Sequence, residues 1–218
     1  YHFQPIVSAH DGHVVAYEAL MRPQLPTLRS PLTVMQLASE MGRLYDIEKL
    51  TFFRACECYE ELEAAGKLDA DALIFVNSIA SVSLSNEDWA SYCEAHSAIL
   101  PKLVVEITEE EEMNERELER KRNVPGSSGV FALDDYGSGY SNGNSLLTIA
   151  PKYVKVDIAI IRGIDTDADK QQFLMTLIDY AHPRGVQVLA EGVETLSELR
   201  TVLEMGVDLL QGYCLARP

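Results

Sequence analysis

Acidic side chains stand at the ends of several apolar stretches of the 218-residue sequence. In VFALDD (130–135) two adjacent aspartates, Asp134 and Asp135, follow an apolar run and precede the glycine-rich stretch YGSGYS. Neighbouring carboxylates raise one another's pKa unless cations neutralise them, and Mg²⁺ and Mn²⁺ prefer such oxygen ligands. The pair therefore indicates a site for divalent cations. The polar residues that end other apolar stretches are Glu18, Asn77, Glu106, Lys155, Glu191 and Gln211.

These apolar stretches have the length and the β-branched content of buried strands. The intervals between them include segments that read as helices: 31–66 is long enough for two, while 170–185 and 196–206 are amphipathic and end in glycine. The alternation predicts an α/β fold, an eight-stranded TIM-like barrel of mostly parallel strands covered by helices. The predicted strands are 3–7, 14–20, 73–78, 103–108, 130–135, 153–157, 186–191 and 209–213.

The first two strands are joined only by SAHDGH (8–13), which is too short for a helical crossover. We therefore expect an antiparallel hairpin with Asp11-Gly12 at its turn, so that the first strand runs against the others. In a barrel of this kind the chemistry lies at the carboxyl ends of the strands. One rim would then carry five carboxylates, and the histidines show no H-x-x-x-H pairing that would favour another metal site. The five are Glu18, Glu106, Asp134, Asp135 and Glu191.

Composition excludes several classes of protein. A formal net charge of −16 argues against a partner that is a large nucleic acid, because such binding depends on clustered Lys and Arg. No apolar stretch approaches the ~20 residues that span a bilayer, so we expect no membrane contact by this domain. The cysteines show no C-x-x-C spacing and are typical of reduced thiols in a cytoplasmic domain. They are Cys56, Cys58, Cys93 and Cys214.

Short motifs follow one another in order, each at a predicted strand end or in the turn after it: YEALMRP (17–23), FVNSIAS (75–81), EITE (106–109), DDYGSGYS (134–141), KVD (155–157), AEGVE (190–194) and QGY (211–213). Together they resemble the EAL domain family of cyclic di-GMP phosphodiesterases over essentially the whole chain. The resemblance implies one domain, 1–218, that hydrolyses cyclic di-GMP to linear pGpG. Since the chain begins without methionine, we expect a domain excised from a longer protein with linked sensory or cyclase domains.

The resemblance also implies a cofactor of two divalent ions, Mg²⁺ or Mn²⁺, with Ca²⁺ inhibitory. Two ions about 3.5 to 4 Å apart can activate water and stabilise the attacking and leaving oxygens. Five carboxylates, two divalent ions and Lys155 have a total formal charge of zero, which lets an acidic domain accept a ligand with two phosphodiester charges. The implied metal ligands are Glu18, Asn77, Glu106, Asp134, Asp135 and Glu191.

Other residues take implied roles in catalysis and substrate binding. Lys155 would orient or deprotonate the attacking water, because nearby metal ions would disfavour its charged form and lower its pKa. Glu191 and Gln211 complete the catalytic set. The implied substrate contacts are Gln4, Leu20, Arg22, Asp157 and Glu194, with Arg22 placed to meet a phosphate. The implied loop anchor after Asp135 consists of Glu109, Gly137 and Gly139, in which the glycines allow conformations closed to other residues.

Simpler interpretations remain open for some of these residues. Asp157 could only join strand ends, and Glu194 could cap the helix at ETLSEL. Beyond Glu109, the run EEEE (109–112) is typical of the first turn of a helix, which the helix dipole favours. The stretch DTDADK (165–170) begins like a calcium loop, but Lys170 stands where glycine is required, so a helix N-cap is expected there.

The chain also departs from the family pattern. Where the family continues with leucine after DDYGSGYS, this sequence has Asn142-Gly143-Asn144. The difference affects the expected stiffness of this loop. It also affects the contacts of a homodimer, an assembly that the resemblance allows. The family's last helix is expected after Pro218. Alternatively, the chain could be a degenerate domain that binds cyclic di-GMP, or only a protein partner, and does not hydrolyse cyclic di-GMP. Because every mapped metal-ligand position is filled, the sequence favours the enzyme.

Overall fold

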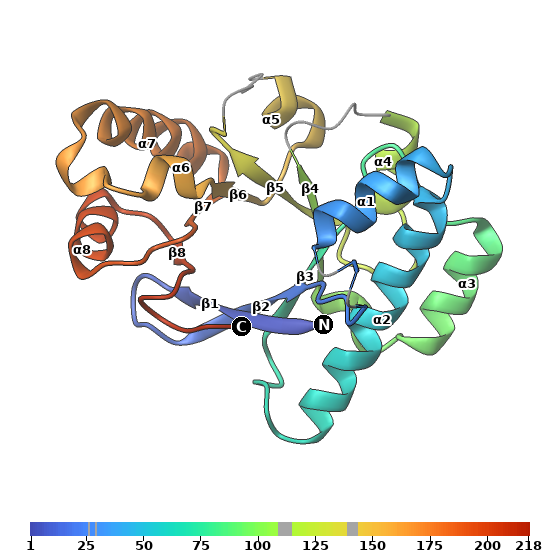
Figure 1. Cartoon of the computed structure of the whole chain (residues 1–218). Coiled ribbons are helices and arrows are strands. Elements are labelled where there is room, and N and C mark those ends of the chain that lie inside the picture. Colours follow the sequence, from blue (N-terminus) through green and yellow to red (C-terminus); the bar gives the residue numbers. More distant parts are fainter. Residues whose placement is uncertain (26, 29, 109–114, 139–143) are drawn as a thin grey trace. The chain divides into compact units, whose positions relative to one another are not determined.

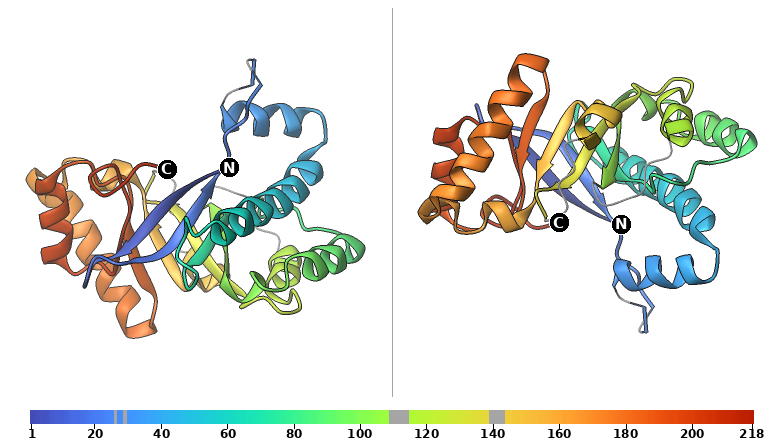
Figure 2. Two further views of the ribbon diagram at one scale, coloured as in Figure 1. Left: turned by 90° about the horizontal axis from the view of Figure 1, so that it is seen from below. Right: turned by 90° about the horizontal axis from the view of Figure 1, so that it is seen from above.

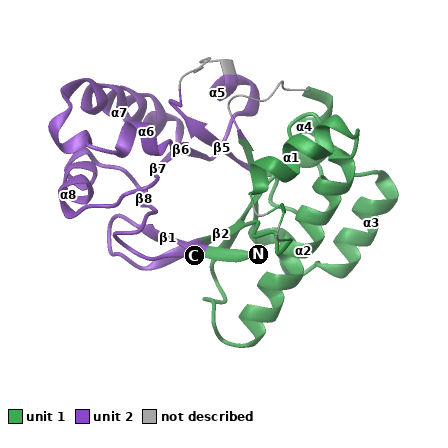
Figure 3. Cartoon of the chain, in the orientation of Figure 1, with its two compact units in different colours: residues 1–3, 17–107, 111–130 green, residues 4–16, 108–110, 131–218 purple. Residues whose placement is uncertain are grey.

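The computed structural model describes residues 1–25, 27–28, 30–108, 115–138 and 144–218. The chain forms two compact units, shown in Figure 3. Unit 1 comprises residues 1–3, 17–107 and 111–130, and unit 2 comprises residues 4–16, 108–110 and 131–218. The elements of each unit are labelled in Figure 1.

The described strands are hydrogen-bonded in chain order and close a barrel. Strand β1 runs antiparallel to β8, with Val7 opposite Leu210, whereas β3–β4, β5–β6, β6–β7 and β7–β8 pair in parallel. The predicted barrel with an antiparallel first strand is thereby confirmed. The strands are β1 (His2–Ser8), β2 (Val14–Leu20), β3 (Leu73–Asn77), β4 (Leu103–Thr108), β5 (Val130–Tyr136), β6 (Tyr153–Val156), β7 (Gln187–Ala190) and β8 (Leu209–Leu210).

The connection between β1 and β2 is a tight turn, as its sequence predicts. The Ser8 N–H donates to the carbonyl of His13 at 2.9 Å, and the Gly12 N–H donates to the carbonyl of Ser8 at the same distance. Gly12 has φ +75°, in the left-handed region that a glycine adopts at no steric cost. The Asp11-Gly12 pair therefore makes this turn.

In unit 1 a long helix, α2, packs on β3 and contacts α1 and α3 (Figure 1). Two helices were predicted within 31–66, and α1 and α2 confirm them. The core contains the fully buried ring of Phe52, whose centroid lies 5.3 Å from that of Trp89 and 5.7 Å from that of Tyr92 in edge-on geometry. The helices are α1 (Pro31–Glu40), α2 (Leu44–Ala64), α3 (Asn86–Ala95), the short η1 (Leu100–Lys102) and α4 (Glu115–Arg122).

In unit 2 the helices α7 and α8 lie against each other, as both views of Figure 2 show in orange and red. The Asp167 side chain accepts from the N–H groups of Asp169 and Lys170, which confirms the predicted N-cap of α7. The helices are α5 (Asn144–Ile149), α6 (Ile158–Ile161), η2 (Ile164–Thr166), α7 (Ala168–Ala181), η3 (His182–Arg184) and α8 (Leu196–Met205).

Helix α7 and strand β8 of unit 2 each end three or more residues before the predicted position. Helix α7 ends at Ala181 instead of 185, because Pro183 has no N–H to donate and the chain continues as η3. Strand β8 ends at Leu210 instead of 213. After it, the carbonyl of Gln211 accepts from Val193, and at Gly212 (φ +156°) a Cβ would lie 2.2 Å from the carbonyl oxygen of Val193. This close approach turns the chain out of the strand.

All four cysteines are free thiols, as the sequence predicts. Among the described residues, no helix combines the length and the apolar character that a bilayer crossing requires.

The segment between β7 and α8 is held by the buried carboxylate of Glu198. One of its oxygens accepts from the Gly163 N–H at 2.8 Å, and the other accepts from Glu194 at 3.1 Å and Thr195 at 2.9 Å. The Thr195 hydroxyl accepts in turn from the Glu198 N–H, which forms a capping box. Burial raises the pKa of Glu198, but the three backbone donors outweigh it, and the pKa falls below the ordinary value of 4.5.

Because the folded pKa of Glu198 is lowered, its contribution to stability is present above about pH 4.5 and is lost as the pH falls through the folded value. We expect Glu198→Gln to lower the free energy of unfolding by about 1.5 to 3 kcal/mol at pH 7, the scale of hydrogen bonds to a charged group. The deficit should shrink on acidification. Urea unfolding of the wild type and the variant at pH 7 and pH 4 measures this difference in stability. An equal difference at both pH values would contradict the stabilising role of the ionised Glu198 carboxylate.

Candidate active site

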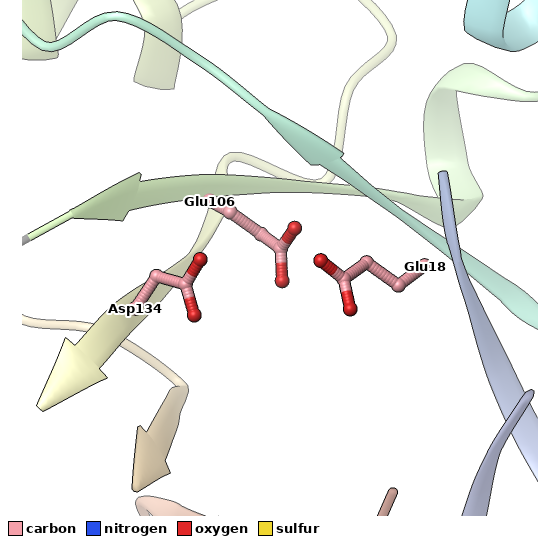
Figure 4. Close-up of side chains that lie close together, drawn as sticks. All are labelled: Glu18, Glu106 and Asp134. Carbon is pink, nitrogen blue, oxygen red and sulfur yellow. The ribbon is translucent and has the colours of Figure 1, made fainter. Parts of the chain in front are cut away.

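Unit 1 contains a pair of carboxylates, those of Glu18 near the end of β2 and Glu106 on β4. Their side chains are buried, with 6% and 1% of their surface exposed, and point toward each other in Figure 4, with carboxylate oxygens within 4.8 Å. Asn77, the last residue of β3, pairs with Glu106 in register. Its Nδ2 donates to Glu106 Oε2 at 3.1 Å and lies 3.5 Å from Glu18 Oε1. The amide thus bridges two buried anions.

Because Asn77 faces the carboxylates with its nitrogen, it acts here as a donor. To serve as a ligand, the amide must turn so that Oδ1 faces the cation. In this structure the amide N–H groups of Asn77 offset part of the repulsion between the two carboxylates, a role that a bound cation would otherwise fill. The set of oxygens suits a divalent ion.

Unit 2 contains a cluster of three carboxylates: Asp134, Asp135 and Glu191 each offer an oxygen within 4.8 Å of the others. Asp134 is 7% exposed, while the other two are half-buried. Three carboxylates this close favour a cation strongly, and all are hard oxygen donors. The predicted partners Asp134, Asp135 and Glu191 are thus brought together within this unit.

A bulge in β5 explains how two adjacent aspartates can share a site. Successive residues of a regular strand point to opposite faces. Here the pairing with β6 shifts register between Leu133 and Tyr136, and Asp135 has φ +55°. The left-handed conformation re-aims its carboxylate, as bulges near functional sites do, and aspartate tolerates it better than most residues. The sequence signal for it is the adjacency of the two aspartates just before Gly137.

A cationic side chain that lies beside these carboxylates is that of Lys155 on β6, which is 1% exposed. Its Nζ lies 2.8 Å from Asp134 Oδ1 and 2.9 Å from Glu191 Oε1. Buried charges need such partners, since an isolated one is costly. Lys155 therefore lies directly beside two of the predicted metal ligands.

Backbone bonds fix Glu191 to the end of β6, the strand of Lys155, and Gln211 to the end of β7. The Glu191 N–H donates to the carbonyl of Val156 at 3.2 Å, and the Gln211 N–H donates to Ala190 at 2.9 Å. Gln211 is buried, with 3% of its surface exposed. Both predicted residues thus lie at the carboxyl ends of β7 and β8.

Asp157 and Glu194 make local contacts. The Asp157 carboxylate caps α6 by accepting from the Ala159 N–H at 2.7 Å. Glu194 forms an ion pair with Arg162 at 2.8 Å, while the cap of α8 that was considered for Glu194 is Thr195. These contacts give Asp157 the role of a helix cap, which differs from the expected tie between strand ends, and give Glu194 a surface partner.

The other predicted substrate contacts make few bonds to side chains. Gln4 is 8% exposed, and its Nε2 donates to the carbonyl of Ala216 at 3.2 Å. Arg22 is half-buried and donates to the carbonyl of Met21 at 3.0 Å, while Leu20 ends β2.

Of the predicted loop anchor, the structure describes Gly137 alone. It has φ +99°, and a Cβ there would lie 2.9 Å from Ile160, so glycine is required. Glu109, Gly139, the run EEEE and Asn142-Gly143 lie outside the described residues, as does the side chain of Asn144.

Sequence analysis missed two charged residues behind Asn77. Glu48 on α2 and Lys121 on α4 are each 1% exposed and form an ion pair of 2.7 Å. A signal was present: Glu48 falls on the helix face that also buries Thr51, Phe52 and Ala55, where a charge is unexpected.

Comparison with known proteins assigns the family. The EAL domain model matches residues 1–218. The chain belongs to the EAL domain family. A curated relative, the probable cyclic di-GMP phosphodiesterase PdeG of Escherichia coli, is 26% identical over 99% of this chain and 44% of its own length. This EAL domain thus spans less than half of that relative.

Solved structures agree with the family assignment. The PaMucR phosphodiesterase in a c-di-GMP complex matches this EAL domain with a TM-score of 0.84 and 26% identity, covering 100% of this chain and 90% of that one. The calcium/cy-diGMP complex of Klebsiella pneumoniae BlrP1 matches with a TM-score of 0.78 and 25% identity, covering 97% of this chain and 53% of that one. The latter pairs the fold with a divalent cation.

Proposed function

We propose that this EAL domain is a metal-dependent phosphodiesterase that hydrolyses cyclic di-GMP to linear pGpG. The observation that carries the proposal is the bulge in β5, which gathers Asp134, Asp135 and Glu191 around one point with Lys155 beside them. A receptor that only binds cyclic di-GMP would not need Asp135 in a left-handed conformation that completes a cluster of three carboxylates. Family membership and relatives named as cyclic di-GMP phosphodiesterases support the substrate.

The acidic residues described above are proposed to hold two divalent ions, Mg²⁺ or Mn²⁺. The donor set fits, because it consists of carboxylates and one amide. Bound there, the ions would activate a water molecule and stabilise the attacking and leaving oxygens of an in-line displacement. The proposed ligands are Glu18, Asn77, Glu106, Asp134, Asp135 and Glu191.

The chain's own residues would supply the remaining chemistry. Lys155 would orient the attacking water or accept its proton, and Gln211 would help to position that water or the Lys155 amine. Arg22 would bind a phosphate through its fork of donors, after leaving the carbonyl of Met21, and Gln4, Leu20, Asp157 and Glu194 are the other proposed contacts. Glu109 with Gly137 and Gly139 would anchor the loop after Asp135.

The setting of the domain is also proposed. The free cysteines support a reducing, cytoplasmic location. Because the chain spans only part of its curated relatives, we propose linked sensory or cyclase domains in the complete protein. A homodimer is a further proposal that a measured molar mass would test.

The test is to incubate the chain with cyclic di-GMP, with and without Mg²⁺, and to separate the products by chromatography. The proposal expects pGpG only with the metal. Binding of cyclic di-GMP without any product, in Mg²⁺ and in Mn²⁺, would favour a non-catalytic receptor instead.

Calcium should suppress the reaction. Ca²⁺ takes more ligands at longer distances than Mg²⁺, so it would occupy the oxygens without aligning water and phosphorus. We expect turnover in Mg²⁺ to fall by about tenfold or more when Ca²⁺ saturates the site, a loss of at least ~1.4 kcal/mol of transition-state stabilisation. Initial rates during a Ca²⁺ titration measure it. Full activity in excess Ca²⁺, or in excess chelator, would contradict the assignment of metal ligands.

A further inference from the structure

A buried charged cluster lies directly behind Asn77 in unit 1. It consists of Glu48 from α2, Lys121 from α4 and the two residues that follow β3, Ser78 and Ile79. The ion pair between Lys121 Nζ and Glu48 Oε1 is 2.7 Å long, and the two side chains are 0% and 1% exposed. We call these four residues the Glu48–Lys121 clamp.

Within the clamp, the side chains of Glu48 and Lys121 bind the backbone of the Ser78–Ile79 segment from both its N–H and its carbonyl side. The Ile79 N–H donates to Glu48 Oε2 at 2.9 Å, and Lys121 donates to the Ile79 carbonyl at 2.6 Å. The Ser78 hydroxyl donates to Glu48 Oε1 at 2.7 Å and accepts from Lys121 at 2.5 Å. Charge-assisted bonds therefore fix this segment at both its donor and its acceptor.

The fixed segment directly follows Asn77, which donates to the Glu106 carboxylate of unit 1. Ser78 follows Asn77, and its N–H donates to the backbone carbonyl of Glu106 at 3.0 Å. Glu106 is also the register partner of Asn77 and accepts from its side chain. Movement of Ser78 would thus shift Asn77 relative to Glu106.

Stability alone is a weak reason for such a pair. Removing two charges from water costs several kcal/mol per ion, and well-packed apolar residues of similar volume often give an equally stable core. What apolar residues could not do is bind the Ile79 N–H and carbonyl. Partners behind metal ligands typically change metal affinity about 10- to 100-fold when they are removed.

We propose that Glu48 and Lys121 are positioning residues that set the divalent-cation affinity of the site by holding Asn77 against Glu106 through the Ser78–Ile79 backbone. This inference rests on the proposed metal site and adds residues that do not touch the cation. It does not depend on turnover.

The chain offers a matched control. Lys102 binds another glutamate of α2, Glu63, at 2.7 Å and the carbonyl of Ala70 at 2.6 Å. It therefore makes the same kinds of bond as Lys121, but it immediately precedes β4 whereas Glu106 lies late in that strand. Lys102→Met should cost stability without changing metal affinity.

The experiment is calorimetric titration of the 218-residue chain with Mn²⁺ for wild type, Lys121→Met and Lys102→Met, each in the Asn77 and the Asn77→Ala background. Lys121→Met should weaken Mn²⁺ binding by about tenfold or more. In the Asn77→Ala background its further effect should fall below about twofold, because a residue that acts through Asn77 is not additive with its loss. Urea unfolding identifies the folded variants.

The outcomes separate the explanations. The proposal would be overturned if folded Lys121→Met kept the Mn²⁺ affinity of the wild type. It would also be overturned if Lys121→Met lost the same Mn²⁺ affinity with and without Asn77, or if Lys102→Met lost as much affinity as Lys121→Met. If Lys121→Met does not fold, Glu48→Gln/Lys121→Met removes the uncompensated charge and takes its place; if this also fails, the clamp is only structural. A wild type that binds Mn²⁺ but hydrolyses no cyclic di-GMP rejects the proposed function and leaves this inference standing, whereas a wild type without Mn²⁺ binding rejects both.

Discussion

Asp135→Asn is expected to abolish hydrolysis of cyclic di-GMP, a loss of about 10³-fold or more, in a domain that stays folded. The substitution removes one charge from the group that Asp135 forms with Asp134 and Glu191. A lost metal ion would forfeit several kcal/mol of transition-state stabilisation, and each 1.36 kcal/mol is tenfold in rate. Asparagine also adopts left-handed backbone readily, so the φ of +55° at this position is retained.

Asp134→Asn should abolish turnover as well, but it is the less specific variant because it also removes the ion pair with Lys155. Initial rates over a range of Mg²⁺ concentrations, with circular dichroism and urea unfolding of each variant, measure both effects. Asp165→Asn, a substitution in the short helix η2, is the matched control and should leave turnover unchanged. Near wild-type rates for Asp135→Asn at modest Mg²⁺ would show that the aspartate pair is structural.

Lys155→Ala is expected to lower kcat by about 10² or more, the usual scale for a lost general base. Substrate affinity should change much less, because we assign it to the metal ions, Arg22 and contacts with the guanines. Turnover in Mg²⁺ and cyclic di-GMP affinity by calorimetry in Ca²⁺ measure the two quantities on one variant. The prediction is thus a fall in kcat without a matching fall in affinity.

Two further variants support this measurement. Lys155→Met preserves more of the buried volume than alanine and should behave alike, so that a cavity does not explain the loss. Lys152→Ala removes an exposed lysine just before β6, where Nζ binds the carbonyl of Gly185, and should leave kcat unchanged. A large loss of affinity in Lys155→Ala with kcat nearly intact would instead make Lys155 a phosphate-binding residue.

The barrel could be predicted from sequence because its strands are local patterns: apolar runs of strand length separated by helical intervals. The expected ligands were also local, since a polar residue that ends a parallel strand reaches the same rim as its neighbours. This is why Asp134, Asp135 and Glu191 were expected together, and the structure groups them.

Other features depend on contacts between distant residues. The bulge at Asp135 arises from pairing with β6, and the clamp joins Glu48 to Lys121, 73 positions apart. Strand β8 ends at Leu210 because Gln211 and Gly212 contact the segment around Val193, which no pattern within 209–213 reveals. Short-range periodicity carries no information on such pairings.

The most direct test of the central claim is hydrolysis of cyclic di-GMP by the chain in ¹⁸O-enriched water with Mg²⁺, followed by mass spectrometry of the product. If the acidic residues direct water onto a phosphodiester, pGpG forms with one ¹⁸O in its terminal phosphate, and Asp135→Asn forms none. Product without ¹⁸O, labelled product in excess chelator, or no product from a folded domain that binds Mg²⁺ and cyclic di-GMP would contradict the account.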